Sequence, residues 1–354
     1  MTPIFFDAAR VLIPFVLAFC VGIALAPILT RFLYKYKVWK KRGGKLAIDG
    51  SVATEFTRLH GERETQTPRM GGLLIWGSVT VVALITSVLA IISREYFWSI
   101  DFVDRSQTWL PLAALIFGGV LGFINDVRDV TTPDARGVRL SVRLGAIALA
   151  ALLAGWWFYE KLDVSSIGIP LIGPVELGLF FIPFFVFVTL AVYASGTIDG
   201  IDGLSGGVFG IIFMVYAGIA FSQGQVTLAA LSATISGAVF AFLWFNVPPA
   251  RFWMTETGTM ALTLALVLVA FSSDVLGDGV GVGVLPIIAL PLTATVLTTI
   301  LQIIWKKLFK RKLFRVAPIH HHFEAIGWPS YKVTMRYWII TILAGVFGLS
   351  LALL

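Results

Sequence analysis

Two aspartates, Asp199 and Asp202, stand in a glycine-rich stretch that separates two long apolar runs. They are three residues apart, so one helical face or one tight loop can hold both. Carboxylates this close to hydrocarbon are costly to bury, and in a membrane protein they indicate a functional site. The glycines at 200, 203, 206 and 207 let a phosphate or a nucleotide approach the backbone closely. The structural alternative is a glycine-rich turn with an aspartate as helix cap.

A second polar segment, residues 67–72, comes just before another apolar run. It reads TPRMGG, in which Pro68 fixes a turn and Gly71 and Gly72 permit a close backbone approach. Taken alone, the pattern is more typical of a turn than of a site. Thr67, Gly71 and Gly72 become candidate substrate-binding residues when the other polar segments are considered with them.

Residues 122–129 place acidic side chains at the end of a third apolar run. Asn125 and Asp126 are adjacent, and Asp129 follows three residues after Asp126, beside Arg128. Asp126 is a candidate catalytic and metal-binding residue, and Asn125 can donate a hydrogen bond to a phosphate oxygen. A solvated helix end with a local ion pair is the alternative.

Residues 245–258 contain few strongly polar side chains between two apolar runs: Asn246, Arg251 and Glu256. Carboxylate oxygens are the ligands that Mg²⁺ prefers, so Glu256 is the candidate metal ligand here. A glutamate at the membrane interface is the competing explanation.

Three adjacent histidines, His320, His321 and His322, lie in the segment 317–328, which reads APIHHHFEAIGW. Neighbours on a regular helix diverge, so three consecutive side chains cannot all face one metal ion. We therefore expect an irregular segment whose histidines contact phosphate and sugar groups, not a zinc site.

The composition requires a membrane for most of the chain. The 354 residues are 58% hydrophobic, with a mean hydropathy of +0.89. The one cysteine, Cys20, excludes an internal disulfide framework, and we expect it to be a small buried side chain. The start lacks the features of a cleaved signal peptide, so we expect the first apolar run to be retained. We predict an all-α polytopic protein with one domain, 1–354, whose ten spans are 11–33, 73–93, 110–125, 141–159, 177–195, 204–222, 226–245, 258–272, 280–305 and 334–354.

The distribution of Lys and Arg predicts the orientation, because cytoplasmic loops carry the excess. Counted in chain order, the odd-numbered loops are rich in them: residues 34–72 alone hold nine. The even-numbered loops together hold three, Arg94, Arg105 and Lys161. Both termini are then periplasmic and the loops with the polar segments cytoplasmic. The net charge of +7 is explained by this topology, so we expect no nucleic-acid partner.

The polar segments fall on the odd-numbered loops, on one face of the membrane. Carboxylates, basic groups and histidines gathered there would suit a diphosphate, a Mg²⁺ ion and a lipid phosphate. In phosphoryl transfer a metal ion bridges phosphate oxygens, so positioning and electrostatics do most of the work.

The chain resembles the polyprenyl-phosphate N-acetylhexosamine-1-phosphate transferase superfamily and, within it, the phospho-N-acetylmuramoyl-pentapeptide transferase family, over nearly its whole length. The most specific match is APIHHHFEAIGW at 317–328. More general superfamily motifs match DGIDGL at 199–204, TPRMGG at 67–72, GFIND at 122–126 and FN at 245–246.

The resemblance implies a ten-helix fold in the bacterial inner (cytoplasmic) membrane, with both termini periplasmic. It implies Mg²⁺-dependent transfer of phospho-MurNAc-pentapeptide from its UDP carrier to undecaprenyl phosphate, forming lipid I and UMP. Asp126 would organise phosphate and metal, Asp199 and Asp202 would line the nucleotide and metal region, and the histidines would bind the sugar nucleotide. A homodimer is left open.

Several positions differ from the pattern of the family. Asn125 stands where the family has the first Asp of a pair, and Glu256 stands where it has a metal-binding Asp. Gly196 replaces an Asn, while Glu64 and Asp129 stand near or at expected lysines. Two other hypotheses stay open: a related transferase that uses UDP-GlcNAc or a similar sugar nucleotide, and a catalytically silent relative that binds the lipid carrier. A transporter would need acids near the middle of its spans, and here they lie at span ends.

Overall fold

The computed structural model describes residues 3–41, 63–93, 100–103, 107–132, 137–276 and 279–354. Arg94 and Arg105, which entered the charge count, lie outside these ranges, as do Arg42, Lys45 and Arg58 of the segment 34–72 and the loop residue Arg136. The helices and strands are, in chain order, α1 (Pro3–Lys35), α3 (Gly72–Ile92), α5 (Trp109–Thr131), α6 (Leu140–Lys161), β1 (Ser166–Ile169), β2 (Gly173–Glu176), η2 (Gly178–Phe180), α7 (Phe181–Ala194), η3 (Ser195–Ile198), α8 (Leu204–Ser222), α9 (Val226–Asn246), α10 (Thr255–Leu276), α11 (Gly281–Ile288), α12 (Leu290–Phe309), α13 (Ile319–Ala325) and α14 (Ser330–Ala352).

Ten helical segments of the described chain are long and apolar enough to cross a membrane. The three at the centre are α8, α9 and α10; 89% of the α10 span is buried inside the protein, against 17% for the α6 span and for the α12 span. A helix that is apolar all round has to be surrounded by other helices or by lipid. The central helices are therefore covered by protein, and the outer helices present their apolar side chains outward.

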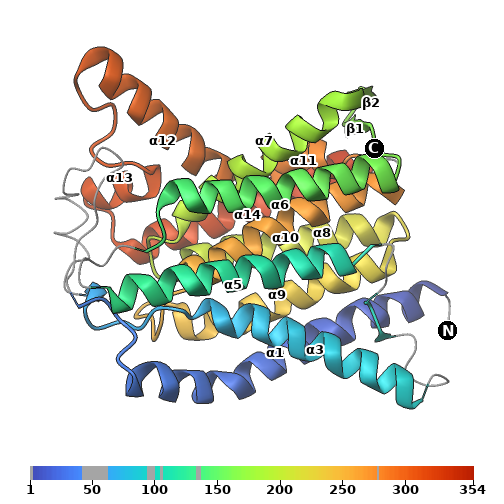
Figure 1. The fold of residues 1–354 in the computed structure, drawn as a ribbon, viewed down its shortest axis with the longest axis horizontal. Helices are drawn as coiled ribbons and strands as arrows, with labels where there is room; N and C mark the ends of the chain where they lie inside the picture. Colours follow the sequence, from blue (N-terminus) through green and yellow to red (C-terminus); the bar gives the residue numbers. More distant parts are fainter. Residues whose placement is uncertain (1–2, 42–62, 94–99, 104–106, 133–136, 277–278) are drawn as a thin grey trace.

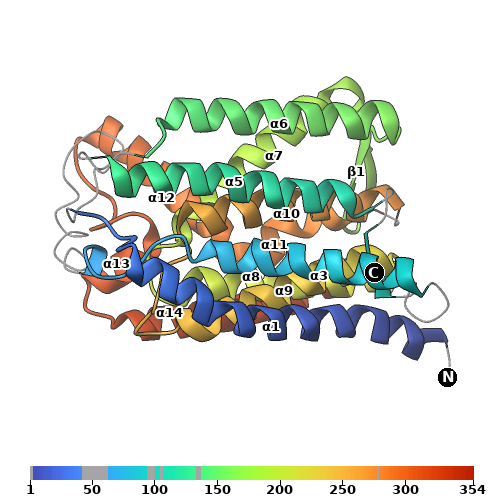
Figure 2. The same cartoon turned by 60° about the horizontal axis from the view of Figure 1, so that its bottom comes forward.

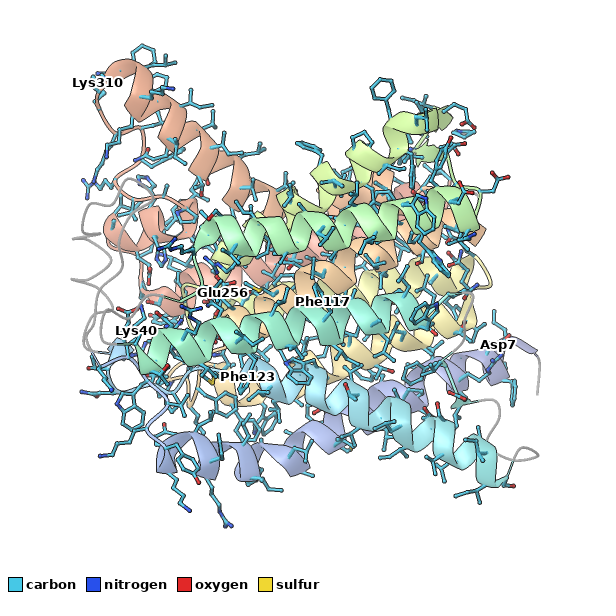
Figure 3. The ribbon with its side chains drawn as sticks, viewed as in Figure 1. Asp7, Lys40, Phe117, Phe123, Glu256 and Lys310 are labelled. Carbon is cyan, nitrogen blue, oxygen red and sulfur yellow. The ribbon has the colours of Figure 1, made fainter. Side chains whose placement is uncertain are left out.

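The spans run side by side along the long axis of the molecule, and α12 diverges from the rest at one end (Figure 1). After a rotation, the same bundle shows α6, α5, α3 and α1 following one another across it (Figure 2). Both termini lie at the same end of the bundle. The labelled side chains of Lys40, Glu256 and Lys310 lie toward the opposite end from Asp7 (Figure 3).

Close helix packing in the centre depends on glycine. A Cβ added at Gly122 of α5 would come within 2.0 Å of the Glu256 carbonyl oxygen, and one at Gly118 within 2.5 Å of the Met260 carbonyl oxygen. No side chain fits at these distances, so α5 and α10 approach each other backbone to backbone.

The predicted ten-span bundle is confirmed, with three corrections. The predicted span 280–305 is two helices, α11 and α12, which break at Ala289 between Pro286 and Pro291. Proline removes a helical hydrogen bond and crowds the preceding turn, which accounts for the break. Residues 166–176, which we did not predict, form a small antiparallel hairpin in which Ile167 pairs with Val175. Cys20 was expected to be buried, but it is exposed on the outer helix α1.

Candidate active site

The start of α10 is the point where acidic side chains from three parts of the chain meet. Asp126 of α5 is fully buried, and its Oδ2 accepts hydrogen bonds from Thr255 Oγ1 at 2.5 Å, Thr257 N at 2.8 Å and Thr257 Oγ1 at 2.6 Å. A carboxylate is stabilised at a helix N-terminus, where unpaired N–H groups point outward. Because Gly122 allows α5 to approach α10 closely, the Asp126 side chain reaches the first turn of α10.

Asp199 reaches the same turn from the glycine-rich stretch. Its Oδ2 accepts a hydrogen bond from Thr255 N at 2.8 Å, and its Oδ1 accepts one from Ser205 Oγ at 2.6 Å. Ser205 is in the first turn of α8, so Asp199 joins the starts of α8 and α10. The sequence motifs around Asp126 and Asp199, 73 residues apart in the chain, are adjacent in the fold.

Asp202 and Asn246 hold the loop before α10. The two carboxylate oxygens of Asp202 accept hydrogen bonds from Trp253 Nε1 at 3.0 Å and Ala250 N at 3.1 Å, and Arg63 pairs with Asp202 at 3.0 Å. Asn246 Oδ1 accepts from Gly203 N at 2.9 Å, while its Nδ2 donates to the Phe252 carbonyl oxygen at 2.9 Å. Each residue is buried, and together they fix residues 250–253 against residues 199–203, which we call the aspartate loop.

The TPRMGG segment packs against the same loop. Gly71 N and Gly72 N donate to the carbonyl oxygens of Trp253 at 2.7 Å and Met254 at 3.2 Å, and Trp253 N donates to the Pro68 carbonyl oxygen at 2.8 Å. A Cβ at Gly72 would lie 2.1 Å from the backbone nitrogen of Gly258 in α10. The close approach predicted from the glycine pair is therefore made by protein backbone.

Thr67 is half-buried, and its N–H donates to the Arg63 carbonyl oxygen at 2.9 Å. This bond holds the start of the TPRMGG segment against the turn that carries Arg63. Substrate binding by Thr67, Gly71 and Gly72 remains a prediction.

Five buried charged side chains form a chain of ion pairs, which we call the charge ladder: Glu64, Lys40, Asp129, Arg69 and Asp126. Lys40 Nζ lies 3.5 Å from Glu64 Oε1 and 3.8 Å from Asp129 Oδ2. Arg69 lies 3.1 Å from Asp129 Oδ2 and 3.9 Å from Asp126 Oδ1. Every member is at most 9% exposed, so each charge depends on its neighbours for compensation.

The charge ladder overturns one alternative that the sequence left open. The end of α5 is not a solvated helix end with a local ion pair, because Asp126 and Asp129 are buried while Arg128 is exposed. Their spacing of three residues places both carboxylates on one face of α5. Their cationic partners, Lys40 and Arg69, come from a distant segment that spacing cannot identify.

Asn125 fixes the segment that leads into α6. Its Oδ1 accepts a hydrogen bond from Val138 N at 2.9 Å, and its Nδ2 lies 3.4 Å from Asp126 Oδ1. A Cβ at Gly137 would come within 2.3 Å of the Asn125 Oδ1. The side chain therefore contacts the backbone of 137–138 and is oriented by it.

Glu256 is paired with a residue that the sequence analysis did not select. Arg143, near the start of α6, lies 2.5 Å from Glu256 Oε1 through its Nη1. The Glu256 side chain is 31% exposed and that of Arg143 20% exposed, so the pair lies at the rim of the buried cluster. The available signal was an arginine two residues inside the apolar run 141–159.

The histidines lie on the helix α13, so the expected irregular segment is wrong. His320 and His321 are buried, and His321 Nδ1 lies 2.7 Å from Glu324 Oε2, whose other oxygen accepts from Ser330 Oγ at 2.6 Å. A Cβ at Gly200 would lie 2.4 Å from His321 Nε2, which places α13 against the aspartate loop.

His322 points elsewhere. Its Nδ1 accepts from Arg315 N at 3.2 Å, and its ring packs at 5.7 Å from that of Phe314. The rings of His320 and His321 lie 4.4 Å apart, and both approach Gly200, so only His322 diverges from its neighbours. Their predicted contacts with phosphate and sugar groups remain predictions.

The donor chemistry fits a magnesium ion that is shared with a substrate, but it does not form a complete cage. No cluster of three or more His, Cys, Asp or Glu side chains suited to a metal occurs within the described ranges. The oxygens of Asp126 and Asp199 already accept hydrogen bonds from the protein, whereas Glu256 is partly exposed and bonded through one oxygen. Mg²⁺ is commonly held by one or two carboxylates with substrate phosphates as further ligands, and Glu256 fits that role best.

Taken together, the cluster offers carboxylates, arginines and a lysine at one end of a membrane-spanning bundle. Such a set can neutralise and orient phosphate groups. Comparison with known proteins agrees with this chemistry. The family model described as "Glycosyl transferase family 4" matches residues 108–274, which include Asp126, Asp199, Asp202 and Glu256.

Three curated relatives bear the name phospho-N-acetylmuramoyl-pentapeptide-transferase. The protein from Anoxybacillus flavithermus is 30% identical over 339 residues, which cover 94% of this chain and 95% of the relative. The one from Caldanaerobacter subterraneus subsp. tengcongensis is 30% identical over 335 residues, covering 93% and 96%. The one from Chlorobaculum parvum is 32% identical over 312 residues, covering 79% and 78%.

Proposed function

The chain belongs to the phospho-N-acetylmuramoyl-pentapeptide-transferase family of phospho-sugar transferases in peptidoglycan synthesis, and we propose that it transfers phospho-MurNAc-pentapeptide from its UDP carrier to undecaprenyl phosphate. The products would be lipid I and UMP. The observation that carries this proposal is the meeting of Asp126, Asp199 and Glu256 at the first turn of α10, with arginines beside them.

The residues of the chain would act by binding and orientation. The lipid phosphate attacks the phosphate that is linked to the sugar, and the bond to the UMP phosphate breaks. A phosphate monoester has a second pKa of about 6, so much of it is dianionic at neutral pH and needs no side chain as base. Asn125 and the arginines Arg63, Arg69 and Arg143 would bind phosphate oxygens, and His320 and His321 would contact the sugar nucleotide.

Mg²⁺ is part of the proposal. When bound, the ion would neutralise charge on the diphosphate, and Glu256 would be its first protein ligand, with Asp126 and Asp199 close by. Asp126 and Asp199 would also keep the first turn of α10 in place, so that the Glu256 carboxylate faces the substrate.

The orientation in the membrane also belongs to the proposal. The labelled lysines Lys40 and Lys310 lie at the end that holds Glu256 and the rest of the acidic cluster, Asp126 and Asp199 (Figure 3). This favours a cytoplasmic site and periplasmic termini in a bacterial inner membrane. Undecaprenyl phosphate would then present its phosphate from the bilayer.

The test is release of UMP from UDP-MurNAc-pentapeptide by the purified protein with undecaprenyl phosphate, with and without Mg²⁺. We expect Mg²⁺-dependent release, abolished in Asp126→Ala and Glu256→Ala and retained in the buried control Thr263→Val. Absence of turnover, where a curated relative turns over, would overturn the proposal. Turnover of UDP-GlcNAc in its place would favour a related sugar-nucleotide specificity, and binding of the lipid without turnover would favour a silent carrier-binding protein.

A further inference from the structure

The carboxylate that is best placed for a metal is bonded to an arginine. Arg143 Nη1 donates a charge-assisted hydrogen bond to Glu256 Oε1. Asp126 and Asp199 accept hydrogen bonds from backbone N–H groups and hydroxyls of neighbouring elements, which stay in place whatever binds. A guanidinium on a long side chain can move away, so the contact of Glu256 with Arg143 can be exchanged.

The place of Arg143 in the fold allows such movement. Its neighbours Ser141 and Val142 are exposed, and α6 packs mainly on α7, while its contact with α10 lies further along the helix, where the Phe158 ring is 6.1 Å from that of Phe271. The pair therefore links the start of α6 to the start of α10 at a partly exposed position. Breaking it leaves the helix packing intact and removes one link between the two helices.

A divalent cation and a guanidinium compete for the same carboxylate, because each needs its negative charge. We infer that Arg143 is the resident counter-ion of Glu256: it pairs with the carboxylate in the metal-free protein and exchanges it for a phosphate group when a divalent cation and the sugar nucleotide bind together. This exchange keeps every charge compensated both before and after binding. After binding, the cation pairs with the Glu256 carboxylate, and Arg143 pairs with a phosphate group of the sugar nucleotide.

The inference rests on the proposed function for the phosphate, but its first half concerns the metal alone. Mn²⁺ serves as the probe, and its binding to the full-length protein in detergent, without nucleotide or lipid, is measured from the electron paramagnetic resonance signal of the free ion. We expect Arg143→Gln to bind Mn²⁺ about tenfold more tightly than the wild type, the equivalent of roughly 1.4 kcal/mol for one partly exposed ion pair. Arg143→Lys, which keeps the charge, should bind with an affinity between the two.

Arg139→Gln is the matched control, because Arg139 is exposed and precedes Arg143 by four residues in the same segment. It should bind Mn²⁺ like the wild type. Glu256→Gln should lose the site. Equal binding by the wild type and Arg143→Gln, with loss in Glu256→Gln, would overturn the counter-ion role and leave the magnesium proposal intact. Equal binding by the wild type and Glu256→Gln would overturn both, while the transfer reaction itself is judged by UMP release.

A measurement on the wild type covers the case in which Arg143→Gln fails to fold. Val142 N and Arg143 N donate to the Arg139 carbonyl oxygen in the first turn of α6. Hydrogen exchange at these amides should become faster when Mg²⁺ is added, because the first turn of α6 loses its ion pair with the first turn of α10. Unchanged or slower exchange there, with Mg²⁺ bound, would overturn the inference.

Discussion

Asp126 shows how a buried carboxylate obtains hydrogen-bond and ion-pair partners from distant segments of the chain. Its Oδ2 has three donors from Thr255 and Thr257, and its Oδ1 faces Arg69. A buried carboxylate without such partners would be neutralised, because burial disfavours the charged form. The threonines beside Glu256 therefore matter for the site although they need not touch substrate, and no motif drew attention to them.

Replacing Thr257 by valine removes one hydroxyl donor to Asp126 and keeps the volume and the Thr257 N–H. Hydrogen bonds to a charged group stabilise by roughly 1.5–3 kcal/mol, so we expect Thr257→Val to lower the free energy of unfolding by about 2 kcal/mol. Denaturant titration in mixed micelles measures this change. Thr263→Val is the control, because the Thr263 hydroxyl donates within α10, to the carbonyl oxygens of Thr259 and Met260. Equal losses in the two variants would show that Asp126 does not need the hydroxyl.

At the scale of elements, the charge ladder fastens the segment that precedes α3 to the end of α5. Lys40 lies between Glu64 and Asp129, both buried, so its removal would leave two acids without their shared cation. Removing one partner of a buried pair is far more costly than removing both.

We expect Lys40→Met to lower the midpoint of thermal unfolding strongly, with a loss of about 3 kcal/mol, and the double variant Lys40→Met/Glu64→Gln to regain part of it. Differential scanning fluorimetry of the purified protein measures both. Lys41→Met is the control, because Lys41 is adjacent and exposed. Additive effects of the two substitutions would mean that Lys40 and Glu64 do not interact.

The elements themselves were largely predictable, because apolar runs of this length report directly on membrane spans. The predicted range 204–222 coincides with α8. The break at Ala289 was missed because hydropathy does not register proline geometry, and α13 was missed because seven residues of mixed character carry no periodicity.

The acidic members of the site were found from their positions at span ends. Arg143 and Lys40 were not, since a basic residue near a span end is ordinary and its partner lies far along the chain.

At the scale of the whole molecule, the two ends of the bundle differ. One end carries the acidic cluster, the charge ladder and Lys310, while the other carries both chain termini. An even number of spans requires the termini to share a side, and the ten spans agree.

Cysteine labelling tests the proposed orientation. In a background with Cys20→Ser, a membrane-impermeant maleimide should label Leu354→Cys in intact spheroplasts, because the C-terminus would be periplasmic. Lys310→Cys should react only after the membrane is permeabilised. Both positions are exposed, so access to the side chain does not limit either reaction. The reverse pattern would place the acidic cluster on the periplasmic side.

The hydrogen bond from Thr257 N to Asp126 spans 131 residues of sequence, and this has a consequence for biosynthesis. At a translation rate of about 5–20 residues per second, Asp126 leaves the ribosome roughly 7 to 26 s before its donors do. During that interval α5 is inserted with a carboxylate that has Arg69 nearby but lacks the threonines of α10. The insertion machinery therefore has to tolerate an incompletely paired acid until α10 is inserted. If the ribosome stalls within α8 or α9, Asp126 of the nascent chain still lacks its donors from α10.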